Sequence, residues 1–334
     1  MTRRHKEDNF FVPLFTMIRL SAPVATIEGE TMKIILVGQG PFGEKTLAAL
    51  SQKGEDIAAV FCPRDKRGEA MKNLAENSGI PVFQPEHMQD AAVRQAYLEL
   101  KPDLVILAFV TDIIPEGLLE IPTIGTICYH PSLLPKHRGA SGINWAIIQG
   151  DRRTGLTILW ADKGIDTGPI LLQKEVEISP DDTTGSIYFN KLFPMGIDAL
   201  VEAVDLIKSG RAPKIAQDHA LATYEPPCDE RHAAIDWSKP ARQVYNLVRG
   251  CDPQPGAHST LGGAKVKFYQ TQLIETAQER EPGQIVGIGS GEVIVALNGG
   301  ALKIGKLKPE TGAKMDGVAF ADEVDLKVGM RFGN

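Results

Sequence analysis

The chain has 334 residues, 43% of them hydrophobic and 23% charged, and its formal net charge at pH 7 is −6. These values are ordinary for a globular enzyme of one large or two moderate domains, and they give no global attraction to nucleic acid. The four cysteines (Cys62, Cys128, Cys228 and Cys251) have neither the CxxC spacing of a zinc site nor the density of a disulfide framework, which favours a cytoplasmic location.

The first 31 residues differ in character from the rest. Residues 2–8 carry charges of both signs, and the short apolar stretch 10–18 is broken by Pro13. A signal peptide has a longer uninterrupted apolar run, so we expect residues 1–31 to be a disordered or over-called extension, with the folded part starting at Met32. No segment approaches the ~20 apolar residues that a membrane span needs, so no membrane partner is predicted.

From residue 32 onward, short apolar strands alternate with helical patterns. Strands are expected at 33–37, 57–61, 80–83, 104–109 and 124–128, and helices up to residue 50 and at 68–77 and 91–100. This alternation predicts an α/β fold with a doubly wound, mostly parallel sheet over residues 32–210. A further strand at 156–160 and helices at 141–149 and 184–208 complete this domain, with Ser141 as a helix cap.

The pattern changes after Gly210. Residues 211–233 are irregular and contain Pro213, Pro226 and Pro227, which predicts a linker. A helix is expected at 241–249, and short β patterns separated by glycines follow at 265–268, 284–286, 292–297 and 302–304. Residues 234–334 are therefore predicted to form a smaller domain, a β-barrel or sandwich.

A glycine motif follows the first predicted strand. Gly38, Gly40 and Gly43 have the GxGxxG spacing of a dinucleotide site, and Asp65 comes after the second strand, where a ribose partner would lie. An NAD-dependent dehydrogenase is therefore one hypothesis. The alternative is that these glycines allow a tight turn or hold another anionic group. Pro41 inside the motif and Pro63 before Asp65 favour this alternative.

Two proton-handling side chains lie in turns after apolar strands. His130 is expected just past strand 124–128, before Pro131, and Asp166 lies in the loop between Gly164 and Gly168, after strand 156–160. Ligands of open α/β sheets bind at the carboxyl ends of strands, so these two side chains are predicted to meet over one pocket. A His and a carboxylate in contact form an acid–base unit.

The runs Tyr129-His130-Pro131-Ser132-Leu133-Leu134-Pro135 and Gly164-Ile165-Asp166-Thr167-Gly168 closely resemble loops of the formyltransferase family that uses 10-formyltetrahydrofolate. The resemblance implies a Rossmann-like N-terminal domain, His130 and Asp166 as catalytic residues, 10-formyltetrahydrofolate as formyl donor and no metal. It also implies folate-binding positions at Asp112, Ile113, Ile114, Ser132, Leu133, Leu134, Pro135 and Asp162.

Cys128 stands where this family usually has an Asn, two residues before the histidine. An Asn amide would stabilise the developing oxyanion by ~3 kcal/mol, and a thiol is a weaker donor. The formyl-hydrolysing N-terminal domain of 10-formyltetrahydrofolate dehydrogenase also lacks this Asn, and the run Trp160-Ala161-Asp162 resembles that domain as well. Cys128 is read as a small apolar residue at a strand end, with a covalent nucleophile as the alternative.

The resemblance leaves the formyl acceptor open. Water or an unidentified acceptor is preferred, because water is the acceptor in the formyl-hydrolysing domain that these motifs resemble. Methionyl-tRNA is the first alternative, but residues 64–68 are short and mixed in charge, where tRNA-using members have a longer basic insertion. An amino sugar on a nucleotide is a further alternative, and a folate sensor without catalysis is the non-enzymatic one. We expect His130 to donate to the formyl oxygen and Asp166 to take the nucleophile's proton.

Overall fold

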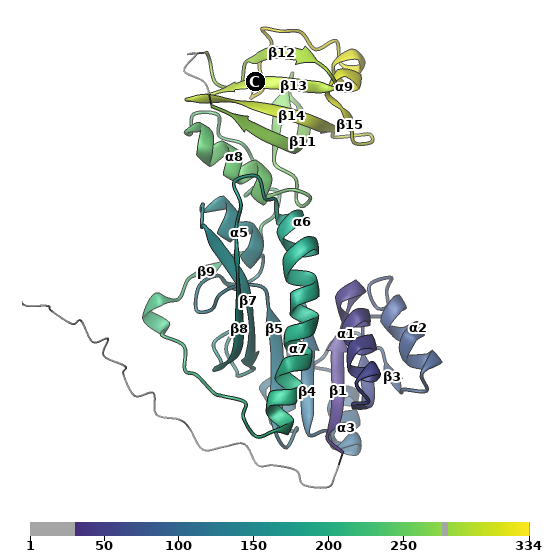
Figure 1. Cartoon of the computed structure of the whole chain (residues 1–334). Helices are drawn as coiled ribbons and strands as arrows, with labels where there is room; N and C mark the ends of the chain where they lie inside the picture. Colours follow the sequence, from purple (N-terminus) through teal and green to yellow (C-terminus); the bar gives the residue numbers. More distant parts are fainter. Residues whose placement is uncertain (1–30, 276–279, 334) are drawn as a thin grey trace, which may run out of the picture.

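The computed structural model describes residues 31–275 and 280–333 (Figure 1). The extension predicted for residues 1–31 therefore lies, except for Thr31, outside the described residues. Among the described residues, no helix has both the length and the apolar character needed to cross a membrane.

The N-terminal domain is built on one seven-stranded sheet with the order β3-β2-β1-β4-β5-β7-β8. Its strands are β1 (Lys33–Gly38), β2 (Asp56–Phe61), β3 (Val82–Phe83), β4 (Leu104–Ala108), β5 (Gly125–His130), β7 (Arg153–Trp160) and β8 (Ile170–Glu177). The first five strands in this order pair in parallel, and β7 pairs antiparallel with both β5 and β8, so β7 alone runs in the opposite direction in this sheet. The predicted mostly parallel, doubly wound sheet is confirmed.

Helices cover both faces of this sheet, which explains why β1 and β4 are almost wholly apolar. Ile34 and Leu36 of β1 pack with α1, α2 and α7, whereas Ile35 and Val37 face α3 and α4. The helices are α1 (Gly40–Gln52), α2 (Glu69–Asn77), α3 (Ala91–Leu100), α4 (Glu116–Leu119), α5 (Gly142–Ile148), α6 (Thr184–Ile187) and α7 (Phe193–Lys208). The long helix α7 runs along the sheet in Figure 1.

The structure differs from the expected elements in several places, of which those around the carboxyl end of β5 and in the helix after β8 matter most here. Strand β8 was not predicted. The helix expected at 184–208 is interrupted by a π-helical turn, Tyr188–Leu192, between α6 and α7. His130, expected just past its strand, is instead the last residue of β5. The pairing of β5 with β4 stops at Cys128, but antiparallel β7 continues the ladder as far as His130, opposite Thr157.

The C-terminal domain is a six-stranded antiparallel sheet with the order β10-β11-β14-β13-β12, and β15 pairs with β14. Its elements are α8 (Ala241–Gly250), β10 (His258–Leu261), β11 (Ala264–Ile274), β12 (Ile285–Gly289), β13 (Glu292–Leu297), β14 (Gly300–Pro309), β15 (Met315–Asp316) and α9 (Gly317–Glu323). Trp237, Phe268 and Phe332 pack together in its core, with Trp237 stacked on Phe332 and Phe268 edge-on to Phe332. The predicted β-rich second domain is confirmed.

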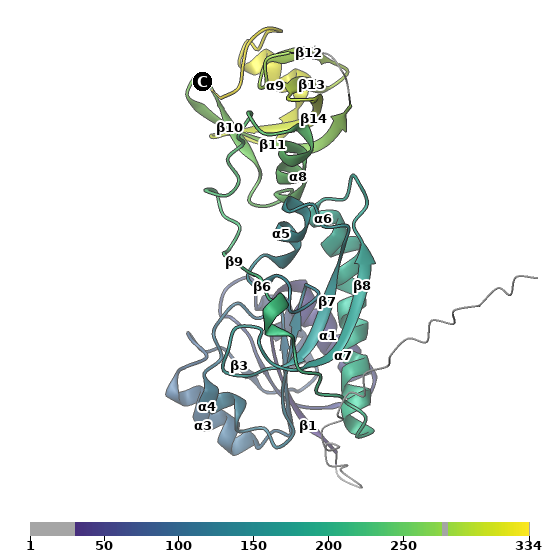
Figure 2. The ribbon, with the colours of Figure 1, turned by 90° about the vertical axis from the view of Figure 1, so that its left-hand side faces the viewer.

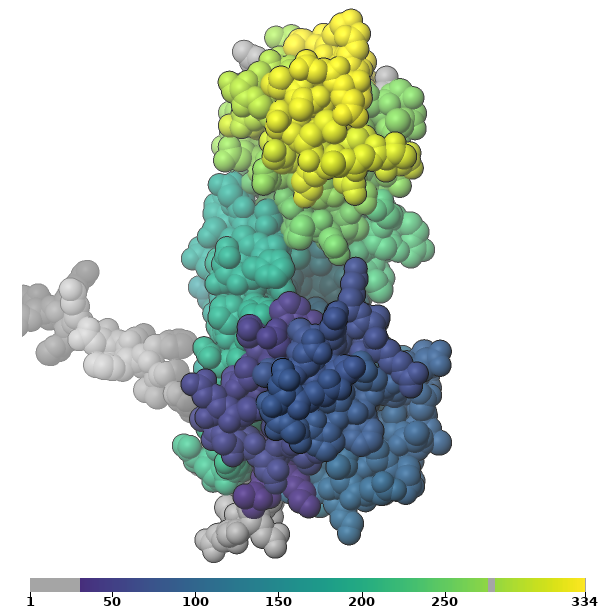
Figure 3. Space-filling view, turned by 90° about the vertical axis from the view of Figure 1, so that its right-hand side faces the viewer, coloured from purple at the N-terminus to yellow at the C-terminus, as the bar shows by residue number. Residues whose placement is uncertain are grey.

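Helix α8 lies between the two domains (Figures 1 and 2), which stack end to end (Figure 3). Arg249 near its end donates from Nη1 to the carbonyl oxygens of Asp182 (2.9 Å) and Ser179 (3.3 Å), both in the N-terminal domain. Asn144 of α5 donates in turn to the carbonyl of Gly250, at 2.7 Å. We call this set of contacts the domain joint.

Candidate active site

The side chains of His130 and Asp166 face each other at the carboxyl end of β5. Their Nδ1 and Oδ2 atoms are 3.5 Å apart, and the side chains are only 7% and 17% exposed. His130 is held by the last pairing of β5, whereas Asp166 comes from the loop between β7 and β8. The topology thus brings together two groups 36 positions apart in the sequence.

A second contact fixes the orientation of the His130 ring. Its Nε2 lies 2.8 Å from the backbone oxygen of His137. A carbonyl oxygen only accepts hydrogen bonds, so Nε2 carries the proton and donates it. The other nitrogen, Nδ1, is therefore the one that faces Asp166 and is left for chemistry.

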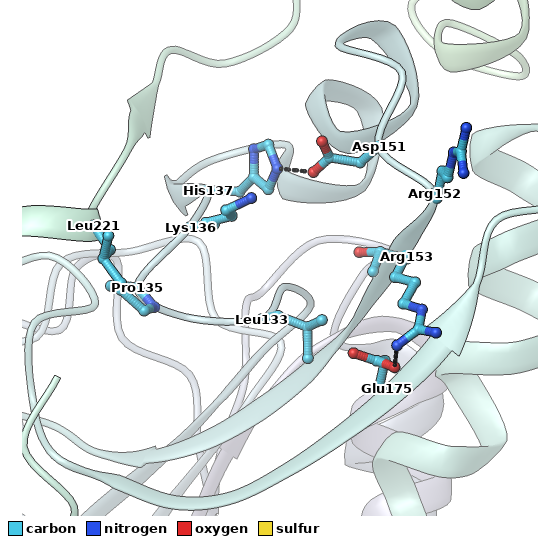
Figure 4. Close-up of a pocket in the computed structure, with 10 residues that line it drawn as sticks. Leu133, Pro135, Lys136, His137, Asp151, Arg152, Arg153, Glu175 and Leu221 are labelled. Carbon is cyan, nitrogen blue, oxygen red and sulfur yellow. Dashed lines mark hydrogen bonds and ion pairs between the residues drawn. The ribbon is translucent and has the colours of Figure 1, made fainter. Parts of the chain in front are cut away.

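His137 is itself fixed on three sides. Its Nε2 lies 3.0 Å from Oδ2 of Asp151 (Figure 4), its Nδ1 lies 3.2 Å from Oε1 of Glu225, and its backbone N–H donates to Oγ1 of Thr223 at 2.8 Å. Because the His137 carbonyl holds His130, these contacts stabilise the orientation of the His130 ring.

Asp166 adopts a left-handed backbone conformation, with φ of 54°. Its Oδ2 accepts a hydrogen bond of 2.8 Å from the backbone N–H of Gly139. Gly139 belongs to the short strand β6 (Arg138–Gly139), which pairs in parallel with β9 (Tyr224–Glu225). The carboxylate of Asp166 is thus directed by a backbone donor toward His130.

Cys128 lies half-buried on β5, the strand that ends at His130, and its Sγ is 3.6 Å from the backbone oxygen of Tyr129. Loss of hydration, and then the negative charge of Asp166, raise the pKa of the Cys128 thiol above its usual range. The thiolate is the nucleophilic form of cysteine, so this environment keeps the sulfur unreactive at neutral pH.

The positions that the family resemblance assigns to folate fall into two kinds. Ile113 is 77% exposed, beside Asp112, whose carboxylate accepts hydrogen bonds from the backbone of Met88 and Ile113. By contrast, Ser132 and Leu134 are buried, and the Ser132 hydroxyl donates to the Lys136 carbonyl at 2.7 Å. These two side chains hold the loop from inside.

The remaining positions also differ. Ile114 is half-buried and packs against the buried apolar side chains on the face of the sheet that α3 and α4 cover. Asp162 accepts hydrogen bonds from Thr167 Oγ1 (2.6 Å) and the Gly164 N–H, so it shapes the loop that carries Asp166. Leu133 and Pro135 line a cavity.

This cavity of about 440 Å³ opens beside the loop from His130 to Gly139 (Figure 4). Leu133, Pro135 and His137 line it together with Lys136, Arg152 and Arg153, and Arg153 is paired with Glu175 at 2.9 Å. His130 and Asp166 are not among the residues that line it.

The glycine motif has a packing role. A Cβ at Gly38 would lie 3.0 Å from the carbonyl oxygen of Ala108, and one at Gly43 only 2.9 Å from Sδ of Met71. The turn from β1 into α1 therefore packs closely against β4 at Gly38 and against α2 at Gly43, whereas Gly40 provides a left-handed conformation with φ of 60°. Asp65, the expected ribose partner, forms an ion pair with Arg67 at 2.8 Å. These contacts account for the motif without a dinucleotide.

Several residues of the site were missed by sequence reasoning. Gln217 is buried and contacts the loop of Asp166, although it belongs to the segment 211–233 that was predicted as a linker. Arg138 is fully buried and binds Gln217. Within residues 31–275 and 280–333, no group of three or more His, Cys, Asp or Glu side chains is arranged to hold a metal ion.

Comparison with known proteins agrees with this architecture. The model of the formyl transferase family matches residues 32–204, and that of the formyl transferase C-terminal domain matches residues 229–324. Human mitochondrial 10-formyltetrahydrofolate dehydrogenase is 39% identical over 296 residues, which cover 84% of this chain and 32% of that protein. The chain thus spans about a third of the length of this relative.

A further relative and a solved structure each match most of the chain. Methionyl-tRNA formyltransferase of Geotalea daltonii is 38% identical over 311 residues, 91% of this chain and 99% of that protein. The crystal structure of HypX from Aquifex aeolicus in complex with tetrahydrofolic acid superposes with a TM-score of 0.67 at 20% identity, over 90% of this chain and 48% of that one, which shows a shared fold. The chain belongs to the formyltransferase family, and it is an enzyme of that family.

Proposed function

We propose that the protein catalyses formyl transfer from 10-formyltetrahydrofolate, releasing tetrahydrofolate, with water or an unidentified acceptor receiving the formyl group. The observation that carries this proposal is the buried contact between His130 and Asp166, 3.5 Å apart at the end of β5. The folate donor is supported by the names of relatives, including the human dehydrogenase that shares 39% identity with this chain.

The contacts of the two side chains suggest how the reaction proceeds. Because Nε2 of His130 is held by the His137 carbonyl, a protonated Nδ1 would donate to the formyl oxygen and stabilise the tetrahedral intermediate. Asp166 Oδ2, beside the same point, would accept the proton of the attacking nucleophile. The C–N bond then breaks, the leaving nitrogen takes the proton that Asp166 had accepted, and tetrahydrofolate leaves. The 3.5 Å separation is expected to tighten when substrate is bound.

The identity of residue 128 supports water as the acceptor, because the formyl-hydrolysing domain that the chain resembles also lacks the family's Asn at this position. The thiol of Cys128 is kept protonated by burial and by Asp166, so it is only a weak donor to an oxyanion. With water as acceptor, the balanced reaction converts 10-formyltetrahydrofolate and water into formate, a proton and tetrahydrofolate, and it needs no oxidant.

Methionyl-tRNA is the second candidate acceptor. One observation favours it: the methionyl-tRNA formyltransferase of Geotalea daltonii matches this chain over 99% of its own length, so both domains have counterparts in it. The net charge of −6 and the ion pair of Asp65 with Arg67 in the loop after β2 speak against a surface for tRNA phosphates. We therefore place water first.

One assay separates these candidates. Release of tetrahydrofolate from 10-formyltetrahydrofolate is followed without acceptor, then with charged methionyl-tRNA, then with an amino sugar linked to a nucleotide. Release without acceptor, with formate as product, is the expected result. Release only with tRNA or only with the amino sugar would assign the acceptor differently. Tight folate binding with no release under any condition would contradict an enzymatic role.

A further inference from the structure

The loop that carries Asp166 is held by a side chain distant in the sequence. Gln217, only 6% exposed, donates from Nε2 to the backbone oxygen of Asp166 at 2.8 Å and to that of Gly168 at 2.7 Å. One amide group therefore binds both ends of the turn from Asp166 to Gly168. A Cβ at Gly168 would lie 1.8 Å from the Trp160 carbonyl oxygen, so this turn is also pressed against the end of β7.

Arg138 determines which way the Gln217 amide points. Oε1 of Gln217 accepts hydrogen bonds from Nε (3.1 Å) and Nη2 (2.7 Å) of Arg138. A flipped amide would place its NH₂ against the guanidinium and its oxygen against two carbonyls, so only one orientation satisfies all four contacts. Tyr224 Oη, which accepts from Arg138 Nη1 at 2.6 Å, holds the guanidinium in turn.

The same stretch of chain holds both parts of Asp166. The backbone N–H of Gly139 binds the carboxylate, and the side chain of its neighbour Arg138 acts through Gln217 on the backbone of Asp166. Asp tolerates the left-handed conformation that Asp166 adopts, with φ of 54°, better than most residues other than glycine, and these hydrogen bonds hold its backbone and its carboxylate in that one arrangement.

We propose that Gln217, oriented by Arg138, is a positioning residue that keeps the Asp166 carboxylate in reach of His130. This inference rests on the proposed function, since it assigns Gln217 a role in the step that uses Asp166. Reactions are sensitive to such placement, and a displacement of about 1 Å can reduce a rate by roughly 100-fold. Gln217 does not touch His130 and is not itself a catalytic residue.

The decisive variant is Gln217→Glu. A carboxylate in this place still accepts hydrogen bonds from Arg138, now as a buried ion pair, which should preserve folding. It has no N–H to donate, so Asp166 and Gly168 lose their common partner. Gln217→Met, which has a similar length and no polar atoms, is the second variant. Gln84→Glu is the matched control, because the Gln84 amide also holds a loop carbonyl, that of Pro63, at 2.8 Å.

The measurement is steady-state release of tetrahydrofolate from 10-formyltetrahydrofolate by each variant of the full chain. We expect kcat to fall by at least about 10-fold in Gln217→Glu and Gln217→Met while KM for the folate changes by less than about 3-fold, as for a loss confined to the transition state. Gln84→Glu should retain the kcat of the unmodified protein. If Gln217→Met does not fold, Gln217→Glu decides alone.

An unchanged kcat in folded Gln217→Glu would overturn the inference, and so would a loss expressed only in KM. Failure of the proposed function is recognised separately in the same assay. It would show as no tetrahydrofolate release by the unmodified protein, or as a normal kcat in Asp166→Asn.

Discussion

Two buried arginines, Arg138 beside the active site and Arg249 at the domain joint, are held in the same way. They are 1% and 6% exposed, and neutral groups bind both guanidinium groups. Arg138 donates to Gln217 and Tyr224, whereas Arg249 donates to the Asn246 side chain and to two carbonyl oxygens of the other domain. Each also lies over a tyrosine ring, at 5.3 Å for Arg138 and 5.7 Å for Arg249.

The difference lies in what each arginine holds. The partners of Arg138 lead to the loop of Asp166, so a change there should affect turnover. The partners of Arg249 belong to the joint between two folded domains, and burial lowers the pKa of its guanidinium, an energetic cost that the hydrogen bonds offset. The comparison teaches that burial of a charged group does not by itself indicate a role in catalysis. Such a role is indicated by the groups to which the charged side chain is hydrogen-bonded.

The largest effect is expected at Asp166 itself. Asp166→Asn keeps an oxygen for the Gly139 N–H but removes the proton acceptor, so kcat for tetrahydrofolate release should fall by roughly 10²–10⁴-fold. The unfolding free energy, measured by urea denaturation, should change little. A folded variant with nearly normal kcat would show that Asp166, and with it the hydrogen bonds of Arg138 that lead to its loop, has no role in turnover.

Arg249→Met should produce the opposite profile. It removes the Arg249 donor from the Asp182 carbonyl and one of the two donors of the Ser179 carbonyl, which should lower the unfolding free energy by about 2–4 kcal/mol. The kcat of the folded variant at low temperature should remain within about 3-fold of the unmodified protein. A loss of kcat similar to that of Asp166→Asn, at full stability, would break the distinction between the two arginines.

Asp182, next to the joint, should make stability depend on acid. Loss of hydration tends to raise the pKa of the Asp182 carboxyl, but hydrogen bonds from Lys191, the Ser179 N–H and Ser186 lower that pKa by more, so the net shift is downward. A carboxyl whose pKa is depressed in the folded state stabilises that state above its unfolded pKa, and this contribution is lost as the pH falls below about 4.

Asp182→Asn should therefore lower the unfolding free energy by about 1 kcal/mol at pH 7, with a smaller difference from the unmodified protein near pH 3. Asp198→Asn, at an exposed position on α7, serves as the control. Urea denaturation at both pH values provides the measurement, and an equal loss at pH 7 and pH 3 would refute the assigned cause.

The smallest effect is expected at Cys128. Because its thiol stays protonated and is a poor donor, Cys128→Ala should change kcat for tetrahydrofolate release by less than about 3-fold. Complete loss of turnover in a folded Cys128→Ala variant would instead indicate a covalent role for the sulfur.

The elements that followed from local pattern were well predicted. Sequence reasoning placed β1, β2, β4 and the helix Ala91–Leu100 within about one residue of their observed bounds. It could do so because the apolar side chains that become buried follow one another, or recur at helical spacing, within each segment. The meeting of His130 and Asp166 could be predicted, although not for the reason given. Because β7 runs antiparallel to β5, its carboxyl end lies beside Ile127, and the loop after it extends to His130. The exact end of β5 could not be predicted, because it depends on pairing with β7, a distant partner.

Other features arise only from tertiary contact. Nothing in the irregular stretch around Gln217 indicates that its amide would reach the loop of Asp166, 51 positions earlier. The spacing of the cysteines likewise gave no sign that Cys228 and Cys251 would lie with their sulfur atoms 3.9 Å apart as free thiols. Such pairs become visible only when the packing of the linker segment against α5 and α8 is known.

The most direct test is a double-mutant cycle on kcat for tetrahydrofolate release, with His130→Ala, Asp166→Asn and the two combined. Residues that act as one unit show strongly non-additive losses. The mechanism predicts that the double variant is about as slow as the slower single variant. Losses that multiply, as for two independent sites, would contradict the central claim that His130 and Asp166 work as a pair.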